Sequence, residues 1–515
     1  MSTPEAAHPY RRWAGPLAVT PAVFVVIFAI LPTVVIARRV GSIDAVSDIL
    51  ANPSVREALW FSLWQSLLSA IVCLALSLPI TWVLSRFEFR GRKLVRALVT
   101  IPFLLPTVVV GVAFLAMLPD RLDYTPIAII LAHAYFNVAV IVRVVGARWE
   151  SISTNLVPAA QTLGASPLQA STTITLAILR RSILTATSLV ALFSFTSFGV
   201  VRMLGGPSRS TIETEIYSRA VLIGDLDGAV VLAVLQVIFL IAVGIIVLRG
   251  ESVTPQRTGQ VVVDRRTLGA PRQRMVVGGI VAVTAVLTVA PWWAAVSRSI
   301  GGWGFIGEPT FRSALNVSLR TALACAVFAS VLGTCSALAT NYGGAWSRLV
   351  SRLTALPLTI PAVVIGFGFL ITFDQAPFDL RSSWIITPLA HSLIAIPLAT
   401  IVVSQATRAI PRDLSAAAMT LGASPRRAWW TVDGPLLTKA IASAAALSAA
   451  VSLGEFGASS FLSRRDSTTL PILISQELSR PGELRSEHAY VIASLFIATS
   501  LVLILSIEFA QGHRT

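Results

Sequence analysis

Apolar residues lie along the chain in long runs that short polar segments separate, a pattern typical of membrane-spanning helices. A helix needs about 20 predominantly apolar residues to cross a bilayer. Twelve runs meet this requirement, at about 17–37, 59–84, 94–118, 125–149, 182–204, 229–248, 275–296, 315–340, 349–373, 384–407, 441–462 and 489–510. The pattern therefore predicts an all-α integral membrane protein with twelve transmembrane helices.

The composition agrees with a membrane protein. Hydrophobic residues make up 55% of the 515 positions and charged residues only 13%, too few charges to cover a soluble surface of this size. A disordered chain is excluded because disorder requires low hydrophobicity. Cys73, Cys325 and Cys335 lie inside apolar runs, without disulfide or metal-site spacing. We expect them to be small core residues, and we expect this chain to bind no metal and no cofactor of its own.

The net charge of +15 arises from 40 Lys and Arg against 25 Asp and Glu. A basic chain can indicate nucleic acid, but these cations lie between apolar runs, so orientation in a membrane explains them better and no nucleic acid is expected. With the N-terminus in the cytoplasm, the cytoplasmic segments carry about +17 and the other side about −2, as the positive-inside rule requires. We expect both termini in the cytoplasm. The first run, after Arg11 and Arg12, is too long for a signal peptide and predicts an uncleaved span.

The chain contains two copies of one unit. The tripeptide Leu-Ala-His ends at His133 and again at His391, 258 residues later. Further pairs at this or a slightly shorter offset are 163–167 with 421–425, Phe198-Gly199 with Phe456-Gly457, Pro106 with Pro361, Gly111 with Gly366, and Ser62-Leu63 with Ser318-Leu319. Six spans per copy is an even number, so both copies share one orientation. We expect two parallel six-helix units at 1–248 and 275–515, joined by a basic cytoplasmic linker at 249–274.

The linker is rich in arginine. These cations could bind anionic membrane lipid, and a solvated linker that obeys the positive-inside rule is the simpler explanation.

A short segment between the fourth and fifth span of each copy predicts a helix–turn–helix on the cytoplasmic face. Gly164 suits the left-handed position that ends a helix, Ser166 can cap the next helix, and Pro167 suits its first position. The second copy repeats this order at 422–425, and leucines give the first helices an apolar side. Two such surfaces suggest docking to a soluble partner that is itself a pair, and an ordinary connector is the structural alternative.

These loops resemble the signature loop of the membrane subunits of ABC importers, which reads Glu-Ala-Ala, three residues, Gly, nine residues, Ile, one residue, Leu-Pro. The alanines, the glycine and the spacing match in both copies, whereas the leading glutamate is missing and only part of the distal end is kept. The candidate ATPase-coupling residues of the two loops are Ala159, Ala160, Leu163, Gly164, Ser166, Pro167, Ala417, Ala418, Leu421, Gly422, Ser424 and Pro425.

The resemblance implies the type I ABC importer permease fold, with each loop seated on one of two ABC ATPase subunits. Neither Lys93 nor Lys439 lies in a Gly-x4-Gly-Lys-Ser/Thr phosphate-binding loop. We therefore expect a transport subunit that is not itself an enzyme, with ATP-Mg bound by the partner ATPases. The resemblance also implies a substrate-binding protein outside the cytoplasmic membrane.

Two sets of residues are candidates for the translocation pathway. Pro106 and Pro361 interrupt equivalent spans, which is tolerated where a helix lines a cavity or packs on protein; a pathway and simple packing kinks both remain open. Glu455 is the one carboxylate well inside a span, with Ser197 as its counterpart. The equivalent phenylalanines that follow are Phe198 and Phe456. An aromatic path with a carboxylate would suit an organic cation or a metal ion, and the alternative is an outer-interface carboxylate satisfied by water or arginine.

The paired His133 and His391 could bind metal, although a repeated packing residue is the favoured interpretation. The segment Leu204-Gly205-Gly206-Pro207 and the fused two-unit layout resemble the permeases for thiamine and for ferric iron, and the Gly-Gly-Pro stretch favours thiamine. The competing class is an ion-gradient-driven secondary transporter, which needs intramembrane ionisable relays. Glu455 and the two histidines are few ionisable residues for such a relay. A secondary transporter would also leave the paired loops without a function.

Overall fold

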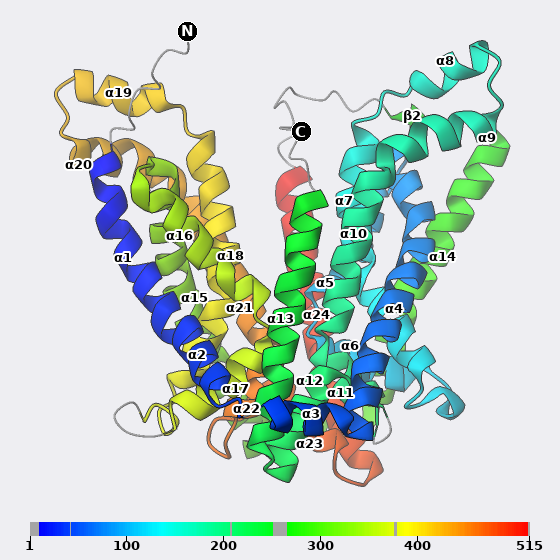
Figure 1. Ribbon diagram of the computed structural model, residues 1–515. Coiled ribbons are helices and arrows are strands. Elements are labelled where there is room, and N and C mark those ends of the chain that lie inside the picture. The colour runs from blue at the N-terminus through cyan, green and yellow to red at the C-terminus, as the bar shows by residue number, and fades with distance from the viewer. Residues whose placement is uncertain (1–9, 42, 207–208, 251–264, 375–378, 513–515) are drawn as a thin grey trace. The chain divides into compact units, whose positions relative to one another are not determined.

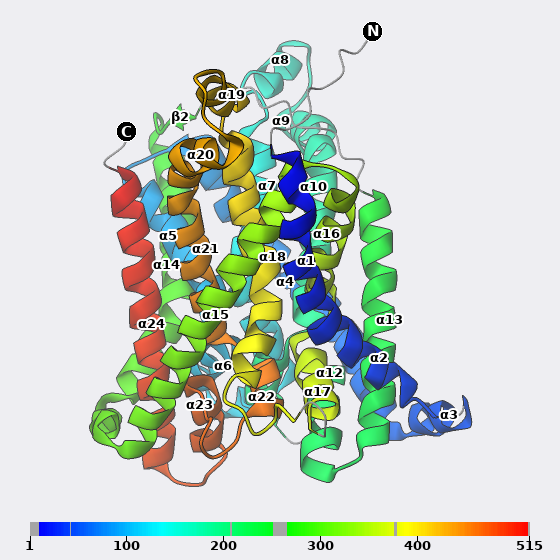
Figure 2. The same cartoon turned by 90° about the vertical axis from the view of Figure 1, so that its left-hand side faces the viewer.

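The computed structural model describes residues 10–41, 43–206, 209–250, 265–374 and 379–512, and this part of the chain is helical almost throughout (Figure 1, Figure 2). The first half forms α1 (Ala14–Val25), α2 (Leu31–Arg38), α3 (Ile43–Ala51), α4 (Pro53–Arg86), α5 (Arg92–Leu104), α6 (Thr107–Met117), α7 (Pro126–Glu150), α8 (Leu156–Thr162), α9 (Pro167–Ala170), α10 (Ala177–Phe195), α11 (Phe198–Leu204), α12 (Ile212–Tyr217) and α13 (Leu226–Gly250).

The second half forms α14 (Pro271–Arg298), α15 (Pro309–Tyr342), α16 (Ala345–Ala355), α17 (Ala362–Thr372), α18 (Ile386–Ala409), α19 (Arg412–Thr420), α20 (Pro425–Ala428), α21 (Gly434–Gly454), α22 (Gly457–Leu462), α23 (Leu470–Leu478) and α24 (Glu483–Gly512). Short 3₁₀ and π segments extend several of these helices. Two short strands, β1 (Phe87–Glu88) and β2 (Arg266–Thr267), pair in parallel. The all-α prediction is confirmed.

Among the described residues, ten helices are long and apolar enough to cross a membrane, and two bent pairs raise the number to twelve if each pair is one span. The axes of α5 and α6 differ by 106°, and the helical segment Ser347–Thr359 meets α17 at 98°. Pro106 and Pro361 stand at these breaks with extended ψ angles of 138° and 146°. The interruptions expected at Pro106 and Pro361 within 94–118 and 349–373 are therefore present, and they are sharp breaks and not gentle kinks.

The chain divides into two compact units, and each unit combines segments from both halves of the sequence. The α15 unit consists of Met1–Ile49, Ile216–Ala242 and Gly307–Leu473. The α4 unit consists of Leu50–Glu215, Val243–Ile306 and Ile474–Thr515. The first helix of each sequence half thus belongs to the unit built on the other half: α1 packs on α15 and α16, and α14 packs on α4, α5 and α6.

The repeat units predicted at 1–248 and 275–515 thus divide the chain differently from the compact units. The two-repeat division stays a prediction. Most of the predicted linker, residues 251–264, lies outside the described residues, as does Pro207. The described end of the linker forms β2, and Arg265 there makes an ion pair of 3.2 Å with Glu150 of α7. Arg92 of α5 reaches the same carboxylate at 3.0 Å. Glu150 therefore links the end of the linker to α5 within the α4 unit.

The core of the α15 unit depends on close helix crossings. A Cβ atom added to Gly333 of α15 would lie 2.6 Å from the Cβ atom of Ala399 in α18, closer than real side chains approach. A Cβ atom added to Gly366 of α17 would lie 2.7 Å from the Cα atom of Ala458 in α22. The equivalent Gly111 of α6 crosses α11 at Met203 in the α4 unit. Glycine at the repeated position therefore lets each broken span cross its neighbour.

The crossing of α17 and α22 predicts the effect of Gly366→Val. The backbone of Ala458 cannot rotate away, so we expect overpacking to destabilise the chain by about 1–3 kcal/mol and to lower the thermal midpoint of the purified protein in detergent. Gly244→Val is the control, since a Cβ atom there meets no described atom within 4 Å. Equal midpoints for the two variants would contradict this packing.

Candidate functional site

The first helix of each predicted loop ends as the sequence indicates. Gly164 and Gly422 have φ angles of +92° and +90°, in the left-handed region that glycine adopts without strain. The amide of Ala165 donates to the carbonyl of Ala160 at 3.0 Å, and the amide of Ala423 donates to that of Ala418 at 3.1 Å. Both ends therefore close with the same Schellman hydrogen bond, which satisfies a carbonyl that the helix leaves free.

The second helix of each loop begins with a serine cap. The Ser166 hydroxyl accepts from the amide of Gln169 at 3.2 Å, while the Gln169 side chain accepts from the amide of Ser166 at 2.9 Å, which makes a reciprocal capping box. The Ser424 hydroxyl accepts from the amide of Arg427 at 3.3 Å. Helices α9 and α20 then begin at Pro167 and Pro425. The predicted helix–turn–helix is present in both copies.

Each loop carries a strongly exposed leucine directly before its glycine. Leu163 is 89% exposed and Leu421 is 90% exposed, the highest values for large apolar side chains among the described residues. In Figure 1, α8 with α9 lies beyond the ends of α7 and α10, and α19 with α20 lies beyond the ends of α18 and α21. Each loop therefore presents an apolar side chain that its own unit does not cover.

Buried polar contacts hold the second loop in place. Asp433 accepts hydrogen bonds from the hydroxyls of Ser415 in α19 and of Tyr10 near the N-terminus. Burial, with the hydrogen bond to Asp433, raises the pKa of Tyr10 to about 12, so the phenol keeps the proton that it donates. Trp429 Nε1 donates to the Tyr342 hydroxyl of α15 at 2.7 Å. Sequence reasoning missed this anchor, because its members lie far apart along the chain.

The first loop is anchored by arginines instead. A guanidinium nitrogen of Arg86, the last residue of α4, donates to the carbonyl of Ile152 at 2.8 Å. Arg266 of β2 donates to the carbonyl of Thr154 at 2.9 Å. The segment that leads from α7 into α8 is therefore fixed to α4 and to the end of the linker.

The runs expected as the fifth and eleventh spans, 182–204 and 441–462, each contain a helix break, and the long apolar helices there, Leu168–Phe195 and Pro425–Gly454, end at it. Helix α10 ends at Phe195 and α11 begins at Phe198; α21 ends at Gly454 and α22 begins at Gly457. No proline marks either break. The available signal was the small and polar composition around Ser197 and Glu455.

Glu455 lies at the second of these breaks and is almost fully buried. One carboxylate oxygen accepts from the amide of Ala458 at 2.8 Å, and the other accepts from the amide and the hydroxyl of Ser459, both at 3.0 Å. His391 Nε2 lies 3.1 Å from the second oxygen. The carboxylate thus caps the N-terminus of α22 and ties it to α18, and neither water nor arginine is needed to satisfy it.

His391 also contacts two serines. Its Nδ1 atom lies 2.7 Å from the hydroxyl of Ser452, and its Nε2 atom lies 2.8 Å from the hydroxyl of Ser459. The sequence interpretation treated this histidine as a packing residue and did not pair it with Glu455. The sequence signal for this pair was the presence of an ionisable residue in each of two neighbouring spans.

The equivalent His133 has different partners. Its Nδ1 atom lies 3.0 Å from the side-chain oxygen of Gln65, whose nitrogen donates to the carbonyl of Ser194 at 3.1 Å. Ser197, the counterpart of Glu455, is buried, and its hydroxyl has no partner among the described residues. Within the described ranges, no group of three or more metal-ligating side chains comes together.

The remaining pathway candidates are also buried. Phe198 begins α11 and Phe456 precedes α22, and both side chains lie inside their units. Pro106 and Pro361 precede α6 and α17, the short helices that cross α11 and α22. The structure thus gathers the candidates of each copy around one pair of crossed, broken spans.

Comparison with known proteins agrees with this arrangement. Residues 329–513, which contain the second loop and the second pair of broken spans, match the family model of the binding-protein-dependent transport system inner membrane component.

Three relatives extend the match. The thiamine transport system permease protein ThiP of Escherichia coli is 26% identical over 488 residues, which cover 88% of this chain and 89% of that protein. The molybdenum transport system permease protein ModB of Mycobacterium tuberculosis is 30% identical and covers 41% of this chain and 83% of its own length. A putative 2-aminoethylphosphonate transport system permease protein, PhnV of Salmonella typhimurium, is 33% identical, with 38% and 73% covered. The chain therefore belongs to the binding-protein-dependent inner membrane components, the multi-pass permease subunits of ABC importers.

Proposed function

We propose that this permease subunit carries thiamine or a closely related organic cation across the cytoplasmic membrane. The observation that supports this most is the share of this chain that each relative matches. The similarity to ThiP of Escherichia coli extends over 88% of this chain, as it does for ThiP of Brucella suis. The similarities to ModB and PhnV extend over 41% and 38% of the chain. Among these relatives the thiamine permeases thus match by far the largest share of this chain. A ferric iron importer is the second candidate.

The orientation that fits this function has both termini in the cytoplasm. The positive-inside count supports it, with about +17 in the segments that then face the cytoplasm. In that orientation both helix–turn–helix loops face the ATP side, and the binding protein delivers substrate to the opposite side.

Each loop then seats in a groove of one of two ABC ATPase subunits, which bind ATP-Mg. The exposed leucines support this role, because covering a leucine side chain is worth about 1.5–3 kcal/mol. When the two ATPases close on ATP, the loops are drawn together and the units move with them. The anchors at Asp433 and at Arg86 and Arg266 let each unit follow its loop as one piece.

The crossed, broken spans form or shape the translocation pathway. Glu455 and His391 fix the position of α22 against α18, while Ser197 and His133 stand at the corresponding places of the other copy. Because donors of its own unit occupy both carboxylate oxygens, Glu455 acts chiefly by positioning α22 and Phe456 along the path. Direct contact between this carboxylate and a cationic substrate is the competing role.

The loops can be tested with Leu163→Asp and Leu421→Asp. A carboxylate in place of an exposed leucine loses the apolar contact and opposes burial, so we expect each variant to bind the ATPase subunits about tenfold more weakly. Co-purification and coupled ATP hydrolysis measure this. Leu484→Asp, at an exposed leucine in the first turn of α24, is the control. Transport that persists without any ATPase subunit would overturn the proposal.

The substrate can be tested with the assembled complex in vesicles. We expect thiamine, added with its binding protein, to stimulate ATP hydrolysis severalfold, while ferric iron, molybdate and 2-aminoethylphosphonate leave the rate at its basal level. Stimulation by ferric iron alone would replace thiamine with the second candidate.

The pathway can be tested with Glu455→Gln. Glutamine places an NH₂ donor among groups that already donate to the carboxylate, and an unmade buried hydrogen bond costs about 1–3 kcal/mol. We expect uptake to fall about tenfold while the ATPase subunits still bind. Ser197→Ala, which removes an unpartnered hydroxyl at the equivalent place, should leave uptake nearly unchanged. Unchanged uptake in Glu455→Gln would remove this residue from the pathway.

A further inference from the structure

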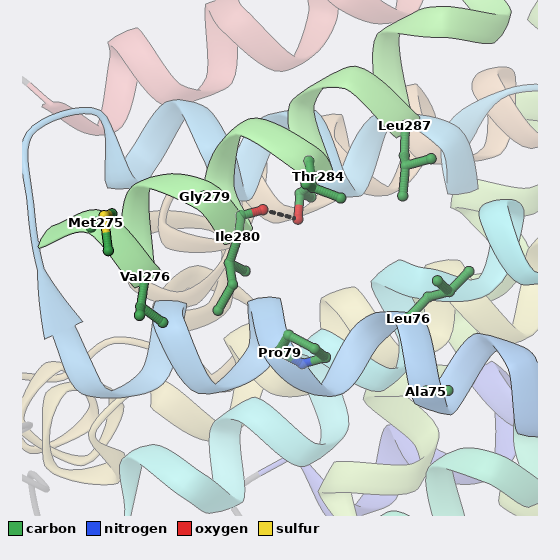
Figure 3. Close-up of a pocket in the computed structure, with 10 residues that line it drawn as sticks. Ala75, Leu76, Pro79, Met275, Val276, Gly279, Ile280, Thr284 and Leu287 are labelled. Carbon is green, nitrogen blue, oxygen red and sulfur yellow. Dashed lines mark hydrogen bonds between the residues drawn. The ribbon is translucent and has the colours of Figure 1, made fainter. Parts of the chain in front are cut away.

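A long apolar groove lies within the α4 unit, between α4 and α14, away from the loops and the broken spans (Figure 3). Its volume is about 520 Å³. Val276, Ile280 and Leu287 of α14 point toward Pro79 and Leu76 of α4. The only hydroxyl in its lining, that of Thr284, donates to the carbonyl of Ile280 at 2.8 Å. The groove therefore offers no unsatisfied side-chain group to a polar ligand and fits a hydrocarbon chain.

The equivalent place in the α15 unit is filled by protein. Leu332 of α15 follows Leu76 by 256 residues, the offset of the repeat in this region. Leu332 is 6% exposed and belongs to a buried cluster on which Phe24 of α1, the counterpart of α14, packs. Leu76 is 45% exposed. The leucine is thus covered in the α15 unit and exposed at the equivalent place in the α4 unit.

Glycine keeps the groove open. Gly279 lies in its wall, opposite Pro79, and a Cβ atom added there would meet no described atom within 4 Å. The neighbouring Gly278 is equally free of contacts but is not part of the lining. A larger side chain at position 279 would therefore occupy space that the fold leaves empty.

The lining that α14 contributes to the groove is about as long as one leaflet of a bilayer. Its lining on α14 runs from Met275 to Leu287, about 18 Å along a helix that rises 1.5 Å per residue. The hydrocarbon core of a bilayer is about 30 Å thick, so a leaflet contributes about half of that. A single acyl chain, entering from one membrane surface, spans the groove.

A cation precedes the groove lining along α14. Residues three or four apart share a helix face, so Arg272, Val276 and Gly279 lie on one stripe of α14. Arg272 is exposed and belongs to the first turn of this 28-residue helix, which no described side chain caps. The amides of Gln273 and Arg274 already donate to the carbonyl of Ala270, so the guanidinium and the helix dipole are what favour an anion here. Arg274 lies on another face, and its Nε atom donates to the carbonyl of Leu268.

We propose that this groove is a specific site for an anionic phospholipid, with one acyl chain along Val276, Gly279 and Leu287 and the phosphate at the guanidinium of Arg272. The site depends neither on the transported substrate nor on the ATPase subunits. It places one lipid against α14, the helix that the second sequence half contributes to the α4 unit.

The test is native mass spectrometry of the full chain, titrated with phosphatidylglycerol and with phosphatidylcholine of the same acyl chains. We expect the wild type to retain one phosphatidylglycerol more tightly than phosphatidylcholine. Gly279→Leu fills the groove and should weaken retention of both lipids about tenfold, whereas Gly278→Leu, its matched control, should not. Arg272→Gln should weaken phosphatidylglycerol about fivefold and leave phosphatidylcholine unchanged, whereas Arg274→Gln should have little effect.

Three results would overturn the proposal. Equal retention of the two lipids by the wild type would show that no anionic site exists. Equal retention by Gly279→Leu and Gly278→Leu would show that lipid binds elsewhere. Dimerisation of the chain that Gly279→Leu abolishes, without any retained lipid, would assign the groove to a second copy. The thermal midpoints of all variants show whether a lost lipid reflects lost folding.

Discussion

The bilayer interior offers no water to a free backbone amide, so every break in a membrane-spanning helix must supply its own partners. This constraint explains the chemistry of three of the helix breaks. At Pro106 and Pro361 no amide hydrogen is left without a partner, because proline has none. The carbonyls of these prolines accept from the amides of Val110 and Ile365 at the start of the next helix. At the break before α22 no proline helps, and the carboxylate of Glu455 takes up the free amides. The carboxylate there thus satisfies the backbone before any role in transport is considered.

Local signals made much of this fold predictable. Apolar length gave the spans, and glycine, serine and proline in order gave the turns at Gly164 and Gly422, because each of these residues acts on its own backbone. Partners distant in sequence were not predictable in the same way. The pairing of Glu455 with His391 needs the packing of α22 on α18, and the membership of α1 in the α15 unit reverses the division that the repeat suggests. The coupling and pathway roles of these residues stay proposals.

The two copies share a backbone plan and differ in the side chains that stabilise it. His133 and His391 occupy equivalent places, yet one contacts the neutral Gln65 and the other the carboxylate of Glu455. Where Leu332 is covered within a buried cluster in one unit, a groove remains beside Leu76 in the other. The side chains at equivalent places therefore differ in charge and in packing between the copies.

The exposed leucines at the loops are apolar side chains that this chain does not cover by itself. A permease gains nothing in stability from leaving Leu163 and Leu421 uncovered, and at about 1.5–3 kcal/mol each they are an appreciable part of a typical folding free energy. The Schellman turns and serine caps nevertheless hold both leucines in one rigid conformation instead of letting them fold back onto the protein. The proposed docking gives this repeated exposure a physical reason, because an ATPase subunit would then cover the leucine of each loop.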